Sequence, residues 1–400
     1  MMKRVMVTEN AKGMFRRFLT GCAGLLALVT CTNFPTPLEN IVAGQKFRPL
    51  AVVCTPPEAA PGDTVQVRFY YYDPPEESPA LHWLVSLDYG IDQHNSVYEK
   101  QVVDLDSMML PGGTVESFRF RVPDSVLTQS TQVSELANDR IANPLHLSVL
   151  SADSILRAAA NLGSVPSQIV ALADNFTGRI LLRAQVRADI SLDVTMPLRI
   201  RYSSKLHSPN VEVNPSIKWV GIITVHQADF NRIDSLSTAV WSMQYLLNAD
   251  HPDSVKDTVR IDSGCSYLAV ADTGDYENPQ FKRPTYTYFS KIDNATLLDT
   301  ENYRYQWFFT NIDYANGMIM DSLLMFGSGG SGSMRSLLPP VDTGMHRFQL
   351  YCTARSSRPN DAGATPGVAY VTSPGYFAYS DAYARNLVRN GTYRRNRYGF

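Results

Sequence analysis

The sequence predicts a mainly β protein with two β-sandwich domains in tandem, each interrupted by a helical insertion. Short segments alternate apolar and polar side chains, as where Val65, Val67 and Phe69 are separated by polar residues, and this period of two is typical of half-buried strands. The order of an early strand, a glycine turn, a tryptophan-containing strand and late strands occurs twice. Two segments between strands have helical spacing instead.

Composition agrees with this fold class. The 400 residues exceed what one hydrophobic core usually organises. Only 18% of the residues are charged, whereas tyrosine (21) and phenylalanine (17) are abundant, as in exported β-rich proteins. A formal net charge of −2 gives no reason to expect nucleic acid as a partner.

The first domain is expected at residues 48–203. Gly62 and Asp63 mark a turn before the alternating strand. Trp83 lies on the third expected strand, where a large ring can fill the space between two sheets. The expected strands are two within residues 49–75, around a proline turn, and then residues 80–90, 116–122, 179–190 and 197–203.

A helical insertion is expected at about residues 123–176. Its clearest helix covers residues 151–164, with Ser151 or Asp153 as the cap and Gly163 at the end. Residues 166–176 predict a second short helix. The insertion could form a lid over a site or cover a sheet edge, and edge cover is favoured. The buried face of the first helix is expected to contain Ile155, Ala158, Ala159 and Leu162.

Residues 204–215 are expected to be a linker, followed by the second domain at 216–380. Its insertion, about residues 229–253, contains a segment with helical spacing through Val240, Met243 and Leu246. Residues 258–272 predict either a strand pair or one bulged strand, and a Gly/Ser spacer follows at 327–333. The other expected strands are residues 217–225, 302–313, 321–327, 345–356 and 367–380.

The strand order resembles that of immunoglobulin-like sandwiches, in which a tryptophan on the third strand fills the core. Asp342 and Gly344, ahead of the strand with Cys352, are similar to the corner before the cysteine-bearing F strand of that family. Tyr305 and Trp307 are similar to the tryptophan strand of polycystic-kidney-disease-type modules of bacterial surface proteins. The resemblance lies in strand patterning rather than in a specific motif.

That resemblance implies a disulfide between Cys265 and Cys352, which export would permit. Against the pairing, their separation along the chain is longer than the family shows. Cys54, beside Val52 and Val53, is instead expected to be a small buried residue. Three cysteines outside the N-terminal leader are too few for a disulfide framework.

The leader has the layout of a secretory signal, because Arg16 and Arg17 precede an uncharged run at residues 18–30. The run is too short to span a bilayer as a helix. Residues 28–31 (LVTC) resemble the lipobox of bacterial lipoproteins, which implies lipidation of Cys31 and its role as the first mature residue. Thr30 departs from the small residue that this family prefers.

Three points about the leader stay open. Residues 19–22 (LTGC) match the lipobox letters better, but no apolar run precedes them. An ordinary cleaved signal or a short N-terminal anchor are alternatives to lipidation. Met14 is a second candidate start, since residues 1–13 add a polar preface. Residues 1–30 are thus expected to be the signal and residues 31–47 a tether.

No enzyme motif or metal-ligand spacing is present in the sequence. Phosphate-binding, nucleophile-elbow and zinc-protease patterns are absent, and the seven histidines show no ligand spacing. His82 and His226 are expected on strands, facing solvent. The acidic loops at 272–278 and 311–317 are explained by turn chemistry rather than by calcium. We therefore expect no catalytic residues, no metal and no cofactor.

Aromatic and basic residues are the candidate binding groups. Residues 70–72 are all tyrosine, so at least one ring should face outward, and Tyr276, Tyr286 and Tyr288 are expected in one loop. The tail at 381–400 is basic and tyrosine-rich, and predicts either contact with anionic envelope material or a solubilising end. The candidate binding residues are Tyr71, Tyr276, Arg385, Arg389, Arg394, Arg395 and Arg397.

Together these features predict a non-catalytic lipoprotein of the bacterial cell envelope, anchored in the outer membrane or at the cell surface. Its role would be structural, adhesive or complex-forming, with an envelope protein or a glycan as partner. The alternative is a carbohydrate-binding or carbohydrate-processing surface protein, because exposed tyrosines can stack on sugars.

Overall fold

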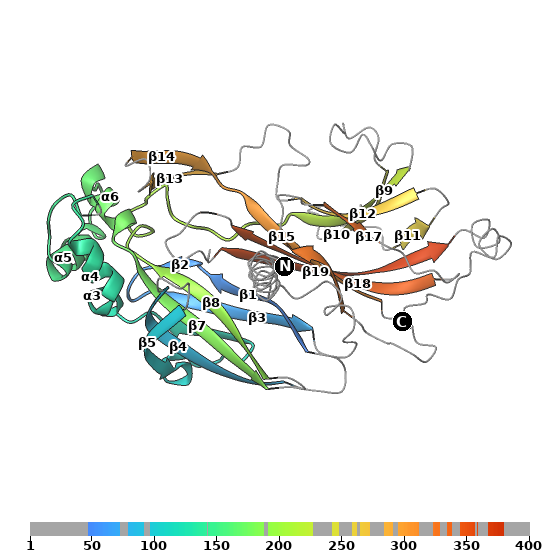
Figure 1. The fold of residues 1–400 in the computed structure, drawn as a ribbon, viewed down its shortest axis with the longest axis horizontal. Coiled ribbons are helices and arrows are strands. Elements are labelled where there is room, and N and C mark those ends of the chain that lie inside the picture. The colour runs from blue at the N-terminus through green and yellow to red at the C-terminus, as the bar shows by residue number, and fades with distance from the viewer. Residues whose placement is uncertain are drawn as a thin grey trace, which may run out of the picture. The chain divides into compact units, whose positions relative to one another are not determined.

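The computed structural model is mainly β, with several separate sheets (Figure 1). It divides into two compact units, residues 1–42 and 43–400, and all of the description below concerns the second unit. The residues that the structure describes are 47–72, 79–91, 97–141, 143–187, 191–226, 242–247, 258–261, 265–272, 284–290, 295–311, 323–328, 334–337, 345–356, 358 and 367–379.

Two sheets form the described part of residues 47–203, here called the first half. One sheet has the strand order β1–β3–β6 and the other the order β2–β8–β7–β4–β5. All neighbours pair antiparallel except β2 and β8, which pair parallel. The strands are β1 (Arg48–Thr55), β2 (Glu58–Ala59), β3 (Thr64–Tyr72), β4 (Ala80–Ile91), β5 (Val97–Asp104), β6 (Ser117–Arg121), β7 (Gly178–Arg187) and β8 (Ser191–Ile200).

The inward side chains of both sheets share one hydrophobic core with Trp83 between them. Trp83 on β4 is 1% exposed, and its ring meets those of Phe69 and Phe118 edge-on at centroid distances of 6.0 and 5.2 Å. Its indole Nε1 donates to the carbonyl oxygen of Val115 at 2.8 Å. The predicted place of this tryptophan in a core between two sheets is confirmed, because Phe69 and Phe118 belong to the opposite sheet.

The turn predicted at Gly62 is present. Gly62 has φ +82°, and a Cβ there would lie 2.8 Å from the carboxylate oxygen Oδ1 of Asp124. The Asp63 carboxylate closes the turn by accepting from the Ala60 backbone N–H at 2.8 Å. Glycine is needed at this position because a left-handed backbone and a close neighbour both disfavour a side chain.

Helices follow β6 and precede β7, and they cover part of the first core (Figure 1). Their apolar side chains, such as Leu127, Leu156 and Leu172, are fully buried in that core. Gly178 begins β7 under this layer, where a Cβ would lie 2.8 Å from a methyl group of Leu127. The helices are η1 (Leu105–Met108, before β6), α3 (Val126–Gln129), α4 (Thr131–Ala137), α5 (Val149–Ala159) and α6 (Ser167–Asn175).

Helix α5 starts earlier and buries a different face than the spacing predicted. Its cap is Ser148, whose hydroxyl accepts from the Ser151 backbone N–H at 3.3 Å. Asp153 is buried instead, where it pairs with Arg157 at 3.0 Å and accepts from the Tyr202 hydroxyl at 3.1 Å. Leu162, expected to be buried, is 60% exposed because the helix ends at Ala159. The buried residues of α5 are Ala152, Asp153, Leu156 and Ala159.

Residues 216–379, here called the second half, contain two further sheets and a ribbon in their described part. The sheet orders are β10–β9–β12–β17 and β11–β19–β18–β15–β16, and β13 pairs with β14. Trp307 is fully buried in a core that both sheets share. The strands are β9 (Trp219–His226), β10 (Ser242–Leu247), β11 (Thr258–Ile261), β12 (Cys265–Asp272), β13 (Thr285–Ser290), β14 (Ala295–Thr300), β15 (Tyr303–Asn311), β16 (Leu323–Ser328), β17 (Met334–Leu337), β18 (Met345–Ser356) and β19 (Val368–Tyr379).

The helix predicted around Met243 is wrong in the residues described there. Ser242–Leu247 is strand β10, which pairs antiparallel with β9 from Ser242–Thr224 to Leu247–Val220. The rest of the expected insertion, 229–241 and 248–253, lies outside the described residues. The segment satisfies two periods, because Met243, Tyr245 and Leu247 also alternate. Pairing with β9 favours the strand over the helix.

Residues 258–272 are two strands in two different sheets. β11 pairs parallel with the end of β19, whereas β12 pairs antiparallel with β9 and β17. Tyr286, expected in a loop, lies on β13, which pairs in register with β14 from Thr285–Thr300 to Ser290–Ala295.

Candidate functional site

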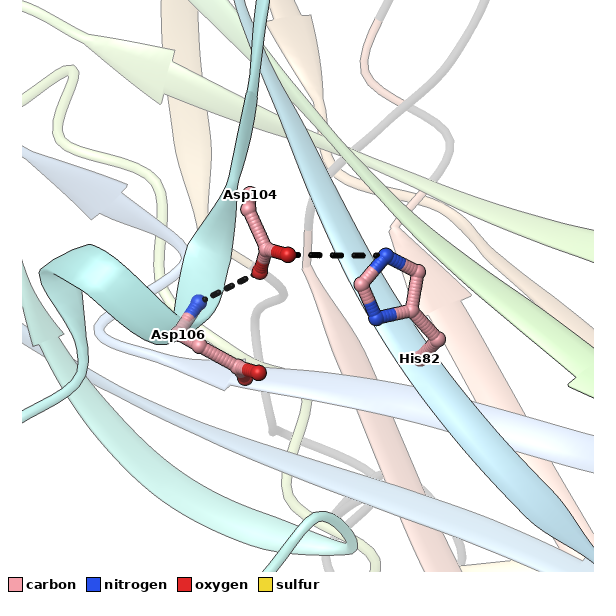
Figure 2. Close-up of side chains that lie close together, drawn as sticks. All are labelled: His82, Asp104 and Asp106. Carbon is pink, nitrogen blue, oxygen red and sulfur yellow. Dashed lines mark hydrogen bonds and ion pairs between the residues drawn. The ribbon is translucent and has the colours of Figure 1, made fainter.

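Two clusters of charged side chains stand out in the described residues, and the first is exposed. His82 on β4, Asp104 at the end of β5 and Asp106 in η1 bring potential metal-ligand atoms within 4.8 Å of one another. Figure 2 shows the His82 ring facing the Asp104 carboxylate, with Nε2 and Oδ2 3.7 Å apart. Imidazole nitrogen and carboxylate oxygen are ligand types that divalent metals accept.

Local structure accounts for each member of this exposed cluster. Leu84 pairs with Asp104 across β4 and β5, so His82 and Asp104 are diagonal neighbours on one face. The Asp104 carboxylate caps η1 by accepting from the Asp106 backbone N–H at 3.0 Å (Figure 2). The His82 and Asp104 side chains are 47% and 51% exposed, so water competes for every contact. The prediction that His82 faces solvent is confirmed.

The second cluster is buried and surrounds the segment 204–215. We call it the charge network. It consists of three carboxylates and three guanidinium groups, so its formal charges balance. The Glu58, Glu212 and Glu301 side chains are 0% exposed. The members of the charge network are Glu58, Arg199, Arg201, Glu212, Glu301 and Arg358.

On the first half, strand pairing places three members of the network side by side. Glu58 on β2 pairs with Arg199 on β8, and both side chains leave the sheet on the face away from the core. Arg201 follows directly and donates to Glu58 at 2.6 Å. The Arg199 guanidinium lies 3.1 Å from a Glu212 carboxylate oxygen. Segment 204–215 therefore covers a sheet face that would otherwise expose charged side chains.

On the second half, Arg358 faces the same segment. Its guanidinium donates to the carbonyl oxygens of Asn210 and Val211 at 3.1 and 3.3 Å, and to the Glu301 carboxylate at 3.1 Å. The group also lies 4.8 Å from the centroid of the Tyr286 ring, within the range of a cation–π contact. A charge that is 96% removed from solvent thus has acceptors at both terminal nitrogens, while its Nε has no hydrogen-bond partner among the described residues.

Two further side chains of the segment, Glu212 and Asn214, are also hydrogen-bonded. The Glu212 carboxylate accepts from the Gly367 backbone N–H at 3.1 Å. The Asn214 amide donates to the Cys54 carbonyl oxygen at 2.7 Å, and its oxygen accepts from the Val368 backbone N–H at 2.9 Å. One side chain therefore bonds β1 of the first half and β19 of the second.

Burial shifts the proton affinities in this network. It raises the pKa of Glu212, although Arg199 and Arg358 act in the opposite direction. Burial also lowers the pKa of Arg199, but a guanidinium stays protonated at any physiological pH. The network therefore holds charge in a place where charge is costly. Its ion pairs offset only part of that cost, because five of its buried nitrogen and oxygen atoms have no hydrogen-bond partner in the described part of the chain.

Apolar contacts join the two halves beside the charge network. Val368 on β19 is fully buried and belongs to the hydrophobic core of the first half. Leu50 and Tyr72 form a small cluster with Phe308 from the second half. The rings of Tyr70 and Tyr370 stack at a centroid distance of 4.1 Å.

Of the seven predicted binding residues, Tyr71 is the one that lies in the described part of the chain. Tyr71 is half-buried against Phe47, and its hydroxyl donates to Glu116 at 2.5 Å on the exposed side. Tyr286, from the expected aromatic loop, is buried under Arg358. Cys31, Tyr276 and the five tail arginines (385, 389, 394, 395 and 397) lie outside the described residues. The charge network was not predicted, because its members are scattered from residue 58 to 358.

The cysteines differ in their surroundings. Cys54 is fully buried, as predicted, and burial raises its pKa to about 12. Cys352 is a buried free cysteine on β18, opposite Trp307. The disulfide to Cys265 implied by the immunoglobulin resemblance is therefore not formed in this structure. Cys265, half-buried at the start of β12, packs against the same core.

Comparisons with known proteins add no family. No family model matches the chain, and a search of curated proteins gave no match. None of the helices in the described residues combines the length and hydrophobicity needed to cross a bilayer.

Proposed function

We propose that the protein is a non-catalytic, lipid-anchored component of the bacterial cell envelope, with a structural, adhesive or complex-forming role. The proposal includes lipidation at Cys31 and two immunoglobulin-like sandwiches in tandem, the first with helices between β6 and β7. The partner would be an envelope protein or a glycan, and neither nucleic acid nor a cofactor is part of the proposal.

The single observation that carries the structural role is the placement of the buried charge network. Glu58, Glu212 and Glu301 are enclosed and paired with arginines, so these carboxylates connect parts of the chain rather than facing a substrate. Paired buried charges and the stacked Tyr70–Tyr370 rings are typical of a fixed contact between modules. The leader supports the envelope location.

One core tryptophan in each half supports the proposal of two sandwiches. Trp83 and Trp307 each lie in a core that two sheets share. This arrangement matches the role of the third-strand tryptophan in immunoglobulin-like domains.

Lipidation is tested by metabolic labelling with a palmitate analogue in a bacterial host. We expect label on the wild type and its loss in Cys31→Ser, with mass spectrometry showing Cys31 as the first mature residue. Cys22→Ser is the matched control, because it removes the competing lipobox and should keep the label. Label retained in Cys31→Ser, or found on neither protein, would contradict the proposal.

The carbohydrate alternative receives specific support from Tyr71. An aromatic ring beside a carboxylate, here Glu116, is a combination that can bind sugar by stacking and hydrogen bonding. Glycan-array binding that Tyr71→Ala abolishes would favour this alternative. Capture of one defined envelope protein, unchanged in Tyr71→Ala and without glycan binding, would favour the structural role.

A further inference from the structure

Segment 204–215 connects two halves that each have their own core, so a flexible hinge is the default expectation for such a connection. We propose instead that this segment is a clamp, and that the charge network and its apolar neighbours make residues 47–379 one cooperative folding unit. This inference does not depend on the proposed function, because it concerns only how the two halves are joined.

Segment 204–215 is hydrogen-bonded to both halves. Asn214 bonds Cys54 on one side and Val368 on the other. Arg358 donates to two carbonyl oxygens of the segment, while the Arg201 guanidinium donates to the Asn210 carbonyl oxygen at 2.7 Å from the first half. A swivelling hinge would have to break these bonds together.

Helix α6 and the β13–β14 ribbon are hydrogen-bonded to the same residue of the segment, Asn210. The Asp174 carboxylate on α6 accepts from the Asn210 amide at 2.8 Å and from the Ser208 hydroxyl at 2.8 Å. The Asn210 amide oxygen accepts from the Thr287 backbone N–H on β13 at 2.9 Å. The Asn210 side chain is thus bonded to α6 of the first half and to β13 of the second, and these two bonds fix the path of the segment.

Each half also contributes apolar surface to the other. Val368 of the second half is 0% exposed within the first core, so separation of the halves would leave a void there. It would also expose Leu50, Tyr72 and Phe308, which are 2%, 7% and 6% exposed. Unfolding of one half therefore removes contacts that the other half requires.

Native-state hydrogen exchange of the full chain tests this coupling. Leu156→Ala weakens the core of the first half, and the slowest amides are followed in β7 of that half and in β18 of the second. For one cooperative unit, exchange accelerates by the same factor in both strands. The reciprocal variant Leu350→Ala, in the second core, should accelerate β7 by the factor measured in β18.

Two further variants keep the test decisive. Leu162→Ala is the matched control, because Leu162 is 60% exposed and its truncation should accelerate neither strand. Ile180→Val is a milder core change for use if Leu156→Ala does not fold. Acceleration confined to the half that carries the substitution would overturn the clamp and establish a hinge.

Discussion

The two charged clusters contain similar side chains but differ in what surrounds them. In the charge network, the Glu301 carboxylate is 0% exposed and its ion pair with Arg358 is enclosed by backbone carbonyls and an aromatic ring. In the exposed cluster, His82 and Asp104 are about half exposed and lie 3.7 Å apart. Breaking the Glu301–Arg358 pair should therefore reduce stability strongly, whereas breaking the His82–Asp104 pair should change it little. The reason is that solvent screens only the exposed pair.

Removing Arg358 is the strongest way to test the buried side of this comparison. Arg358→Met leaves the Glu301 carboxylate charged and buried without its partner, which should cost about 3–5 kcal/mol in the free energy of unfolding. Urea denaturation measures the loss. Glu301→Gln in the same chain should restore part of it, and an equal loss in single and double variants would contradict the ion-pair explanation.

Leu156 on α5 and Leu162 after its end give the corresponding test without charge. Leu156→Ala should cost about 2–5 kcal/mol because it leaves a cavity in the first core. Leu162→Ala should stay within about 0.5 kcal/mol of the wild type, since that side chain is exposed. Equal costs, measured by thermal or urea unfolding, would show that the buried face of α5 has been assigned incorrectly.

The exposed cluster predicts a smaller effect that depends on the cap. Asp104→Ala should cost about 1 kcal/mol, because the Asp106 backbone N–H loses its side-chain acceptor. Asp104→Asn is the matched control, since its amide oxygen can still accept. His82→Ala removes only the exposed pair and should cost about 0.2–1 kcal/mol. A larger loss in His82→Ala than in Asp104→Ala would contradict the capping role.

The smallest expected effect is a change in the slope of stability with pH. The pKa of Glu212 is raised in the folded protein above its ordinary value of 4.5, so the folded state binds this proton more tightly than the unfolded chain. Stability from this group therefore falls as the pH rises from about 4.5 through the raised pKa. Glu212→Gln should remove that decline, whereas Glu135→Gln on the exposed face of α4 should not. Parallel curves for wild type and Glu212→Gln would refute the prediction.

Strand positions could be predicted where alternation and strand length agree. β4, β6, β15, β18 and β19 lie where the sequence placed them, with ends that differ by a few residues. β5 was missed, because its Glu99-Lys100-Gln101 centre is polar on an edge strand. β10 was assigned to a helix, because Met243, Leu246 and Leu247 fit the helical period, whereas Met243, Tyr245 and Leu247 fit the strand period. The local residue pattern cannot predict the secondary structure of a segment that is stabilised mainly by pairing with a distant strand.

The mainly β class, the alternating core faces and the central position of Trp83 follow from the order of the residues alone. These are short-range properties, since they follow from residue spacing and from the need to bury apolar side chains. Which charges are buried depends instead on contacts between distant segments. Arg199 on β8 and Arg201 directly after the strand are spaced like solvent-facing residues, and only Glu58, segment 204–215 and Arg358 convert that face into an interior. A polar face becomes buried when segments from distant parts of the chain cover it. The spacing of residues along one strand does not predict which segments these are.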